Sequence, residues 1–147
     1  MSLSLAAAFT IFATAGFPVP PSVSYERAAV KDVCPEYYAC VSWPEDENAP
    51  ARIALPKNAP ASTVIHEAAH LVDVTFLTPA QRGKRIAPRL KRAVRPVIND
   101  EGSTWVRFYA ERYADSVAEC LGYRASYAHR PKLPKPTRRY CRALVPR

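Results

Sequence analysis

The sequence predicts a helix-rich α+β fold with a small edge sheet. Two long segments, 62–78 and 104–123, repeat apolar side chains at the spacing of an α-helix. One short apolar stretch, 52–55, is bounded by prolines on both sides and predicts a strand. The length of 147 residues fits a single domain, which we expect over residues 18–147.

Residues 1–17 form an apolar leader that allows two interpretations. No charged side chain precedes Glu26, and residues 13–15 (ATA) match the small-residue site at which secretory signals are cleaved. The basic residues that usually open such a signal are missing, so the alternative is an apolar arm that docks against the protein or a partner. Prolines from Pro18 onward interrupt the apolar run near the length needed to cross a bilayer, so we expect no stable transmembrane span.

Six prolines divide residues 18–50, so this segment is expected to form at most short strands joined by stiff connections. The stretch WPEDENAP, residues 43–50, indicates an exposed acidic loop. The strand predicted at 52–55 follows this loop, and Pro60 suits the first position of the next helix.

The four cysteines predict two disulfides. None of them forms a Cys-x-x-Cys pair, the spacing typical of a cysteine zinc site. Of the three possible pairings, we favour Cys34 with Cys40 and Cys120 with Cys141, which would tie the tail to the last long helix. Disulfides persist in oxidising compartments, so they favour a secreted or cell-envelope protein, or a virion-associated one if the leader is retained.

The net charge of +8 is concentrated in two basic segments. Residues 82–95 carry seven Arg and Lys and no acid, and the tail from Arg124 onward carries eight and no acid. Such segments are most often solvated surface, but they also allow an anionic surface as a partner. Nucleic acid is not favoured, because residues 82–95 lack interleaved aromatic side chains and match no nucleic-acid-binding motif.

Proline placement predicts the local structure of both basic segments. Ile86, Leu90 and Val94 recur at a spacing of four and indicate helical turns over 79–95, interrupted at Pro88. The prolines at positions 131, 134 and 136 predict an extended, non-helical tail.

The segment 62–78 predicts a buried helix with one polar stripe. At 100° per residue, His66, His70 and Asp73 lie on one narrow stripe, and apolar side chains flank it on both sides. A helix that is apolar on both flanks is buried. The polar stripe must then be satisfied inside the protein, by hydrogen bonds or by a ligand.

The motif His66-Glu67-Ala-Ala-His70 predicts a zinc site. On a helix it places two imidazoles one turn apart, so that both can reach one ion at a Zn–N distance of about 2.0–2.1 Å. Glu67 lies beside the open coordination position, where it can take a proton from the attacking water. Zinc lowers the pKa of such a water toward about 7. The plainer alternative is that the two histidines pair with carboxylates of the core.

The helix predicted over 104–123 supplies acidic candidates for a third zinc ligand. Glu111, Asp115 and Glu119 share a narrow arc opposite a broad apolar face, and on their own they would be interpreted as a solvated helix face. The stretch from Glu111 to Glu119, ERYADSVAE, resembles the second signature of gluzincin metallopeptidases, in particular the lethal-factor-like and Pro-Pro endopeptidase group. HEAAHLVD, residues 66–73, resembles the HExxHxxD motif of the same group.

The resemblance, which covers at most residues 52–123, implies a minimal zincin-like metallopeptidase domain that hydrolyses peptide bonds in a peptide or protein substrate. It implies zinc as cofactor, held by His66, His70 and Glu111. It implies Glu67 as the general base and Asp115 as a residue that orients a ligand histidine. We expect Asp73 to support the ligands from outside the ligand set as well.

Three points stay open at the level of sequence. Asp73 or His129 could be the third ligand instead of Glu111, although a ligand on the same helix spreads the set poorly. The oxyanion-stabilising tyrosine of the group lies seven residues before the glutamate ligand, where this chain has Thr104. Tyr109, Tyr127 and His129 are candidates for that role. The alternative to a peptidase is a structural or docking protein that keeps zinc for stability, for example a virion or envelope component.

Overall fold

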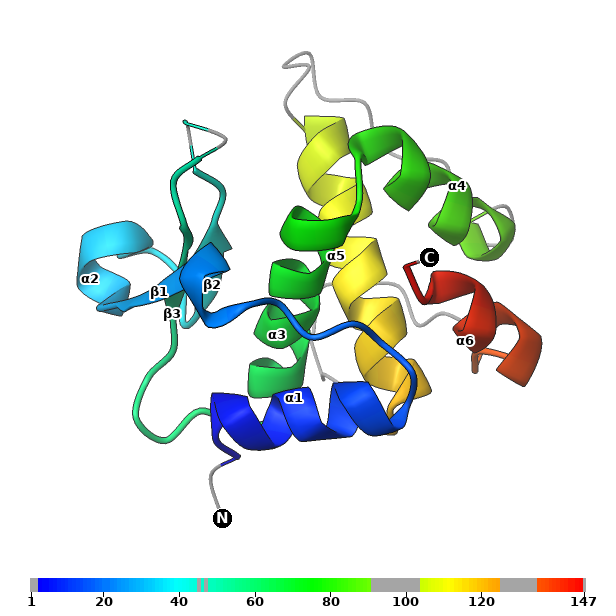
Figure 1. The fold of residues 1–147 in the computed structure, drawn as a ribbon, viewed down its shortest axis with the longest axis horizontal. Helices are drawn as coiled ribbons and strands as arrows, with labels where there is room; N and C mark the ends of the chain where they lie inside the picture. The colour runs from blue at the N-terminus through cyan, green and yellow to red at the C-terminus, as the bar shows by residue number, and fades with distance from the viewer. Residues whose placement is uncertain (1–2, 45, 47, 91–103, 125–134, 147) are drawn as a thin grey trace.

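The computed structural model describes residues 3–44, 46, 48–90, 104–124 and 135–146. These residues form a helix-rich α+β fold with one small mixed sheet, which confirms the predicted fold class. In Figure 1 the sheet lies to one side, α3 (Ala61–Phe76) and α5 (Thr104–Cys120) run side by side in the middle, and α1 (Leu5–Thr14) crosses one end.

The sheet has three short strands, in the spatial order β1 (Tyr25–Ala28), β3 (Ala51–Ala54) and β2 (Cys40–Ser42). β3 lies in the centre, parallel to β1 and antiparallel to β2. It confirms the strand predicted at 52–55, displaced by one residue. The expectation of only short strands over 18–50 also holds, with two short helical pieces, η1 (Ser22–Ser24) and α2 (Val30–Val33), added to them.

α3 is the central helix of the core, and it confirms the predicted buried helix. It begins directly after Pro60, and all of its residues from Val64 to Asp73 are buried. Its apolar side chains pack against α1 on one side and α5 on another. The polar side chains of the stripe are therefore enclosed by protein, as the flanking apolar residues predicted.

α1 belongs to the same core. Its buried side chains include Phe9 and Phe12. The helix ends at Thr14, and Gly16 just beyond it has a φ of 84° that lets the Phe17 N–H bond to the Phe12 carbonyl at 2.9 Å. The ring centroids of Phe12 and Phe17 then lie 5.5 Å apart, so the two rings pack against each other at the end of α1. The apolar leader thus packs against the protein here, and its cleavage after residue 15 stays a prediction.

α4 (Pro79–Leu90) corrects two expectations about the first basic segment. The helix continues through Pro88 to Leu90, the last residue described there, instead of being interrupted at the proline. An interior proline costs one hydrogen bond and a steric clash, and the packing of α4 on the fold outweighs this cost. Arg82 is buried rather than part of a solvated basic surface. Leu90 and Val94, predicted at the buried edge with Ile86, lie outside the described side chains, whereas Ile86 is buried.

α6 (Arg138–Leu144) corrects the prediction of a wholly extended tail. The prolines that predicted extension end at Pro136, and the Thr137 side chain then caps the helix by accepting the Tyr140 N–H at 3.2 Å. Buried Leu144 holds α6 in place, and its carbonyl accepts a hydrogen bond from the Tyr113 hydroxyl on α5 at 3.0 Å. Contacts with the rest of the fold therefore stabilise α6.

Both predicted disulfides are present, and they account for all four cysteines. Cys34–Cys40 closes the loop before β2, and Cys120–Cys141 joins the end of α5 to α6. Two disulfides are compatible with an extracellular protein. Among the described residues, no helix is both long enough and apolar enough to cross a membrane.

Candidate metal centre

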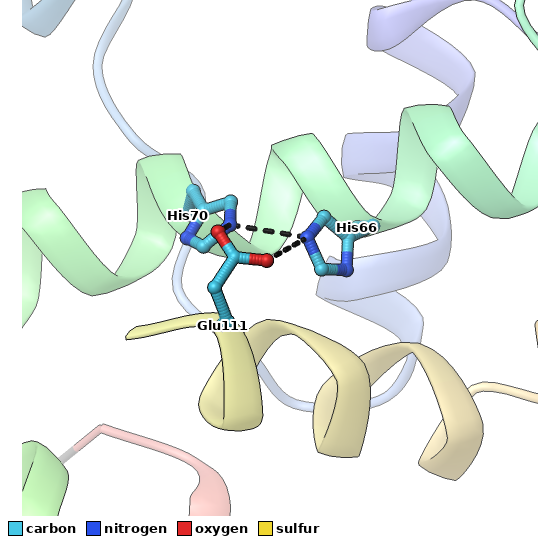
Figure 2. A group of neighbouring side chains, drawn as sticks. All are labelled: His66, His70 and Glu111. Carbon is cyan, nitrogen blue, oxygen red and sulfur yellow. Dashed lines mark hydrogen bonds and ion pairs between the residues drawn. The ribbon is translucent and has the colours of Figure 1, made fainter. Parts of the chain in front are cut away.

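Two buried histidines and one partly exposed glutamate meet between α3 and α5. His66 and His70 project from α3, and Glu111 points toward them from α5, as Figure 2 shows. The four-residue spacing places both histidines on one face of α3, and the packing of α5 against that face brings in the glutamate. The structure thus brings together the three residues that the motif resemblance implied as ligands, and one donor atom from each lies within 4.8 Å of the others.

The distances between the donor atoms suit a small metal ion. His66 Nε2 and His70 Nε2 are 3.1 Å apart. One carboxylate oxygen of Glu111 lies 3.3 Å from His66 Nε2, and the other lies 3.2 Å from His70 Nε2. Two ligands that each lie about 2.0–2.1 Å from a tetrahedral ion are themselves about 3.3–3.4 Å apart. The group could therefore hold a metal ion with little rearrangement.

Asp115 contacts the far side of the His66 ring. Its Oδ1 lies 3.0 Å from His66 Nδ1, one helical turn along α5 from Glu111. A carboxylate at this position keeps a proton on Nδ1 and leaves the Nε2 lone pair directed at the donor group. That is the tautomer a metal ligand needs, and the contact agrees with the role predicted for Asp115.

The electrostatics of the group favour a positive charge at its centre. Burial lowers the pKa of His66, but hydrogen bonds to Asp115 and Glu111 and the negative charge of Glu67 outweigh burial and raise the pKa to about 9. Burial acts to raise the pKa of Glu111, but hydrogen bonds to His66 and His70 outweigh it and hold that pKa well below its usual range. At neutral pH the group therefore binds either a proton or a cation in its place.

Glu67 is buried next to His66, and its charge acts on the His66 ring. It lies about 100° around α3 from that histidine, on a different part of the helix surface from the face that carries His66 and His70. This is the placement expected for a group that handles a proton beside the ligands and does not join them. Its role as general base remains a prediction.

The donor group opens toward solvent on the side of Glu111. The Glu111 side chain is 39% exposed, whereas the His66 and His70 side chains are each 3% exposed. Trp43, directly after β2, is itself 39% exposed, and its ring lies 5.5 Å from the His70 ring in a T-shaped contact. The sequence analysis missed Trp43, because the contact joins distant segments and no local pattern marks the residue.

Asp73 has a different partner from the predicted one. Its carboxylate oxygens accept hydrogen bonds from Arg82 Nε at 2.7 and 2.5 Å, and the two residues are 0% and 2% exposed. Burial raises the pKa of Asp73, although the Arg82 hydrogen bond and charge act to lower it. Asp73 pairs with this arginine and lies outside the donor group, but the charge of His70 also acts to lower its pKa. Its support of the ligand histidines stays a prediction. Asp73 lies about one turn beyond His70 along α3, where its side chain contacts α4.

The candidates for transition-state stabilisation are only partly described. Tyr109 is half-buried and packs against the core, and Thr104 begins α5. Tyr127 and His129 lie outside the described residues, so the alternative that makes His129 a ligand stays a prediction.

Comparisons of the chain with protein-family models, with curated proteins and with solved structures found no match. The function is therefore argued from the geometry of the group and from the motifs that supply its residues.

Proposed function

We propose that this protein is a zinc-dependent peptidase with a minimal zincin-like domain, in which His66, His70 and Glu111 hold the zinc. The observation that carries the proposal is the meeting of the His-Glu-x-x-His helix with a glutamate from a second helix, with donor atoms 3.1–3.3 Å apart. Two imidazoles and one carboxylate form a ligand set found in catalytic zinc sites. Magnesium and calcium prefer sites built from oxygen alone, so this set favours zinc.

Each residue of the site has a separate role in the proposed peptide hydrolysis. Zinc, when bound, would polarise the scissile carbonyl and lower the pKa of the attacking water toward about 7. Glu67 accepts the proton of that water and passes it to the leaving amine. Asp115 holds His66 in the tautomer that directs Nε2 at the donor group.

Two observations support a catalytic rather than a structural role for the metal. Structural zinc sites are typically closed by four protein ligands, whereas the described residues bring three together, and Glu111 is open to solvent. In addition, the fold has a core around α3 and two disulfides, so it does not depend on a metal for its framework. A structural or docking protein that merely retains zinc is the alternative that the experiment has to separate.

The natural substrate is a peptide or protein, and the disulfides favour an extracellular or cell-envelope location for the reaction. Trp43 would form one wall of the approach to the donor group, because its exposed ring lies against His70.

Substitution of Glu67 distinguishes a catalytic from a structural role of the metal. Glu67→Gln keeps the shape of the side chain, so the protein should fold and bind zinc as before. Cleavage of a diverse peptide library should fall by about 10²–10⁴-fold, the usual effect of removing an acid–base catalyst. Glu26→Gln, at an exposed position paired with Arg52, is the matched control and should leave cleavage unchanged.

His70→Ala tests the ligand set in the same assay. It should lose zinc and activity together, measured by elemental analysis and by peptide cleavage. Undiminished zinc in His70→Ala, or cleavage by Glu67→Gln at the wild-type rate, contradicts the proposal. A wild-type protein that retains zinc but cleaves no peptide of the library supports the structural alternative.

A further inference from the structure

A basic pocket lies between the end of α5 and α6. Its volume is about 600 Å³, within the range of about 300–1,000 Å³ that is typical of small-molecule sites. The charged side chains that line it are Arg124, Lys135, Arg138, Arg142 and one carboxylate, Glu119. Four cations thus share the pocket with a single acid.

The pocket is separate from the metal centre. Glu111 and Cys120 both belong to α5, but they are nine positions apart, which places them on opposite sides of the helix and about 13 Å apart along its axis. Glu111 faces α3, whereas Cys120 lines the pocket and faces α6. A ligand in the pocket would therefore not contact the donor group.

Two contacts hold α6, which forms one wall of the pocket. The disulfide Cys120–Cys141 is part of the lining and fixes α6 to α5. The Arg85 guanidinium on α4 donates to the Ala143 carbonyl at 2.8 Å and holds α6 from a second side. A backbone that is fixed before a ligand arrives loses little freedom on binding, which favours affinity.

The end of α5 also prepares the pocket. Gly122 adopts a φ of 85°, and the Tyr123 N–H bonds to the Ala118 carbonyl at 2.8 Å while the Gly122 N–H bonds to the Glu119 carbonyl at 3.1 Å. These bonds satisfy two carbonyls at the C-terminal end of α5 and fix the turn that follows it. The turn then carries Arg124 to the pocket.

The cations repel one another in this arrangement. Arg138 and Arg142 are four residues apart and share one face of α6, a placement that is unfavourable for like charges. An anion in the pocket would remove this repulsion. Three of the four cations are arginines, whose planar forks match phosphate oxygens with paired hydrogen bonds.

We propose that this pocket is a binding site for a phosphate-bearing anion of the size of a diphosphate, either free in solution or carried on a lipid. The site is independent of the proposed peptidase activity. It places the anionic partner expected from the basic segments at the second of them, whereas Arg82 of the first is paired with Asp73 and Arg85 donates to the Ala143 carbonyl.

The test is calorimetric titration of the full chain, disulfides intact, with inorganic pyrophosphate at low salt. The double variant Arg138→Gln/Arg142→Gln should bind pyrophosphate at least about tenfold more weakly, since it loses two charge-assisted donors. Arg139→Gln is the matched control, because Arg139 is an exposed neighbour on the same helix outside the lining, and it should bind as wild type does. Zinc content should be equal in all three proteins.

Co-sedimentation with phosphatidylcholine vesicles, with and without phosphatidic acid, distinguishes the two sources of phosphate. Binding to pyrophosphate alone assigns a soluble ligand, and binding to phosphatidic acid vesicles that the double variant loses assigns a lipid-borne one. The proposal is overturned if wild type binds neither probe, or if Arg139→Gln weakens binding as much as the double variant. Equal affinity for a tetraglutamate peptide would also overturn it, because the site would then select acidic peptides and not phosphate.

Discussion

α3 carries two buried polar clusters one turn apart, and they are completed in different ways. Asp73 is closed by Arg82, whose Nε lies 2.7 and 2.5 Å from the two carboxylate oxygens. His66, His70 and Glu111 instead direct their donor atoms toward one another at 3.1–3.3 Å. The first cluster contains its own cation, whereas the second has none among its members unless His66 is protonated.

The comparison shows that burial of a charge does not by itself identify a functional site. An ion pair whose two partners both come from the chain has its charges balanced without a ligand. A set of ring nitrogens and carboxylate oxygens that converge on one point has a place for a cation that the chain does not supply. His66, His70 and Glu111 therefore form the cluster that could hold a metal ion.

Removal of Arg82, the cation of the first cluster, should have the largest effect on stability. Arg82→Met leaves the Asp73 carboxylate buried without its partner, and the free energy of unfolding should fall by about 3–5 kcal/mol. The double variant Asp73→Leu/Arg82→Met should recover most of this loss, because an apolar pair of similar volume replaces the ion pair. Urea unfolding of the metal-free proteins measures both. A loss below about 1 kcal/mol in Arg82→Met would show that the pair is not the closed cluster described here.

A rise in pH should lower the stability that the second cluster (His66, His70 and Glu111) gives to the metal-free protein. His66 has a pKa of 6.5 when unfolded and about 9 when folded, so its stabilisation is complete below pH 6.5 and is lost as the pH rises through 9. The shift corresponds to about 3 kcal/mol of unfolding free energy across this window. Zinc affinity should change in the opposite direction and rise with pH, because the metal displaces the proton.

Denaturation in the presence of a chelator, repeated from pH 6 to pH 10, measures the change in stability. The His66→Gln variant provides the comparison. It lacks the titrating group, so its free energy of unfolding should no longer decrease with pH between these limits. A slope that persists unchanged in His66→Gln would assign the pH dependence to another residue.

The contact between Asp115 and His66 should have an intermediate effect. Asp115→Asn weakens the hydrogen bond that fixes the His66 tautomer, and zinc affinity should fall by about 10–100-fold, the range observed when such supporting partners are removed. Glu119→Gln, an acid-to-amide change one turn further along α5, should leave zinc affinity unchanged. Competition with a chromophoric chelator gives both affinities, and equal losses in the two variants would remove the special role of Asp115.

The smallest effect concerns Trp43. Its ring contact with His70 is worth about 0.5–1.5 kcal/mol at most, so Trp43→Phe should alter zinc affinity by less than about tenfold. Cobalt bound in place of zinc should quench the Trp43 fluorescence of the wild type, and the variant should lose this part of the quenching. Identical quenching in both proteins would mean that the metal binds elsewhere.

Several parts of the site were accessible from the sequence because they depend on short-range geometry. The four-residue spacing of His66 and His70 places both rings on one helix face wherever that helix lies. The apolar flanks of the same segment predicted its burial, and the structure confirms it. The sequence favoured one of three possible cysteine pairings, and both of its disulfides are present. Glu111 and Asp115 needed the resemblance of a second motif, since nothing in their own spacing points to α3.

Other parts could be decided only by the tertiary structure. Arg82 looked like one of a run of surface cations, and its pairing with Asp73 arises because α4 folds back beside the end of α3. α6 follows three prolines in a basic tail, and its helix is held by contacts to α5 that local propensity does not encode. Trp43 reaches His70 only through the position of β2 beside α3.

The sequence by itself determined the helical periods and the placement of His66 and His70 on one helix face, because both depend on positions a few residues apart along the chain. It favoured one of three cysteine pairings, and Glu111 came from the resemblance to a second motif. The tertiary structure decided which buried charge has a partner within the chain, which side of the donor group is open, and where the cations of the tail gather. These outcomes depend on how separate segments pack, and packing is set by the shape and burial of the whole core and not by any local spacing.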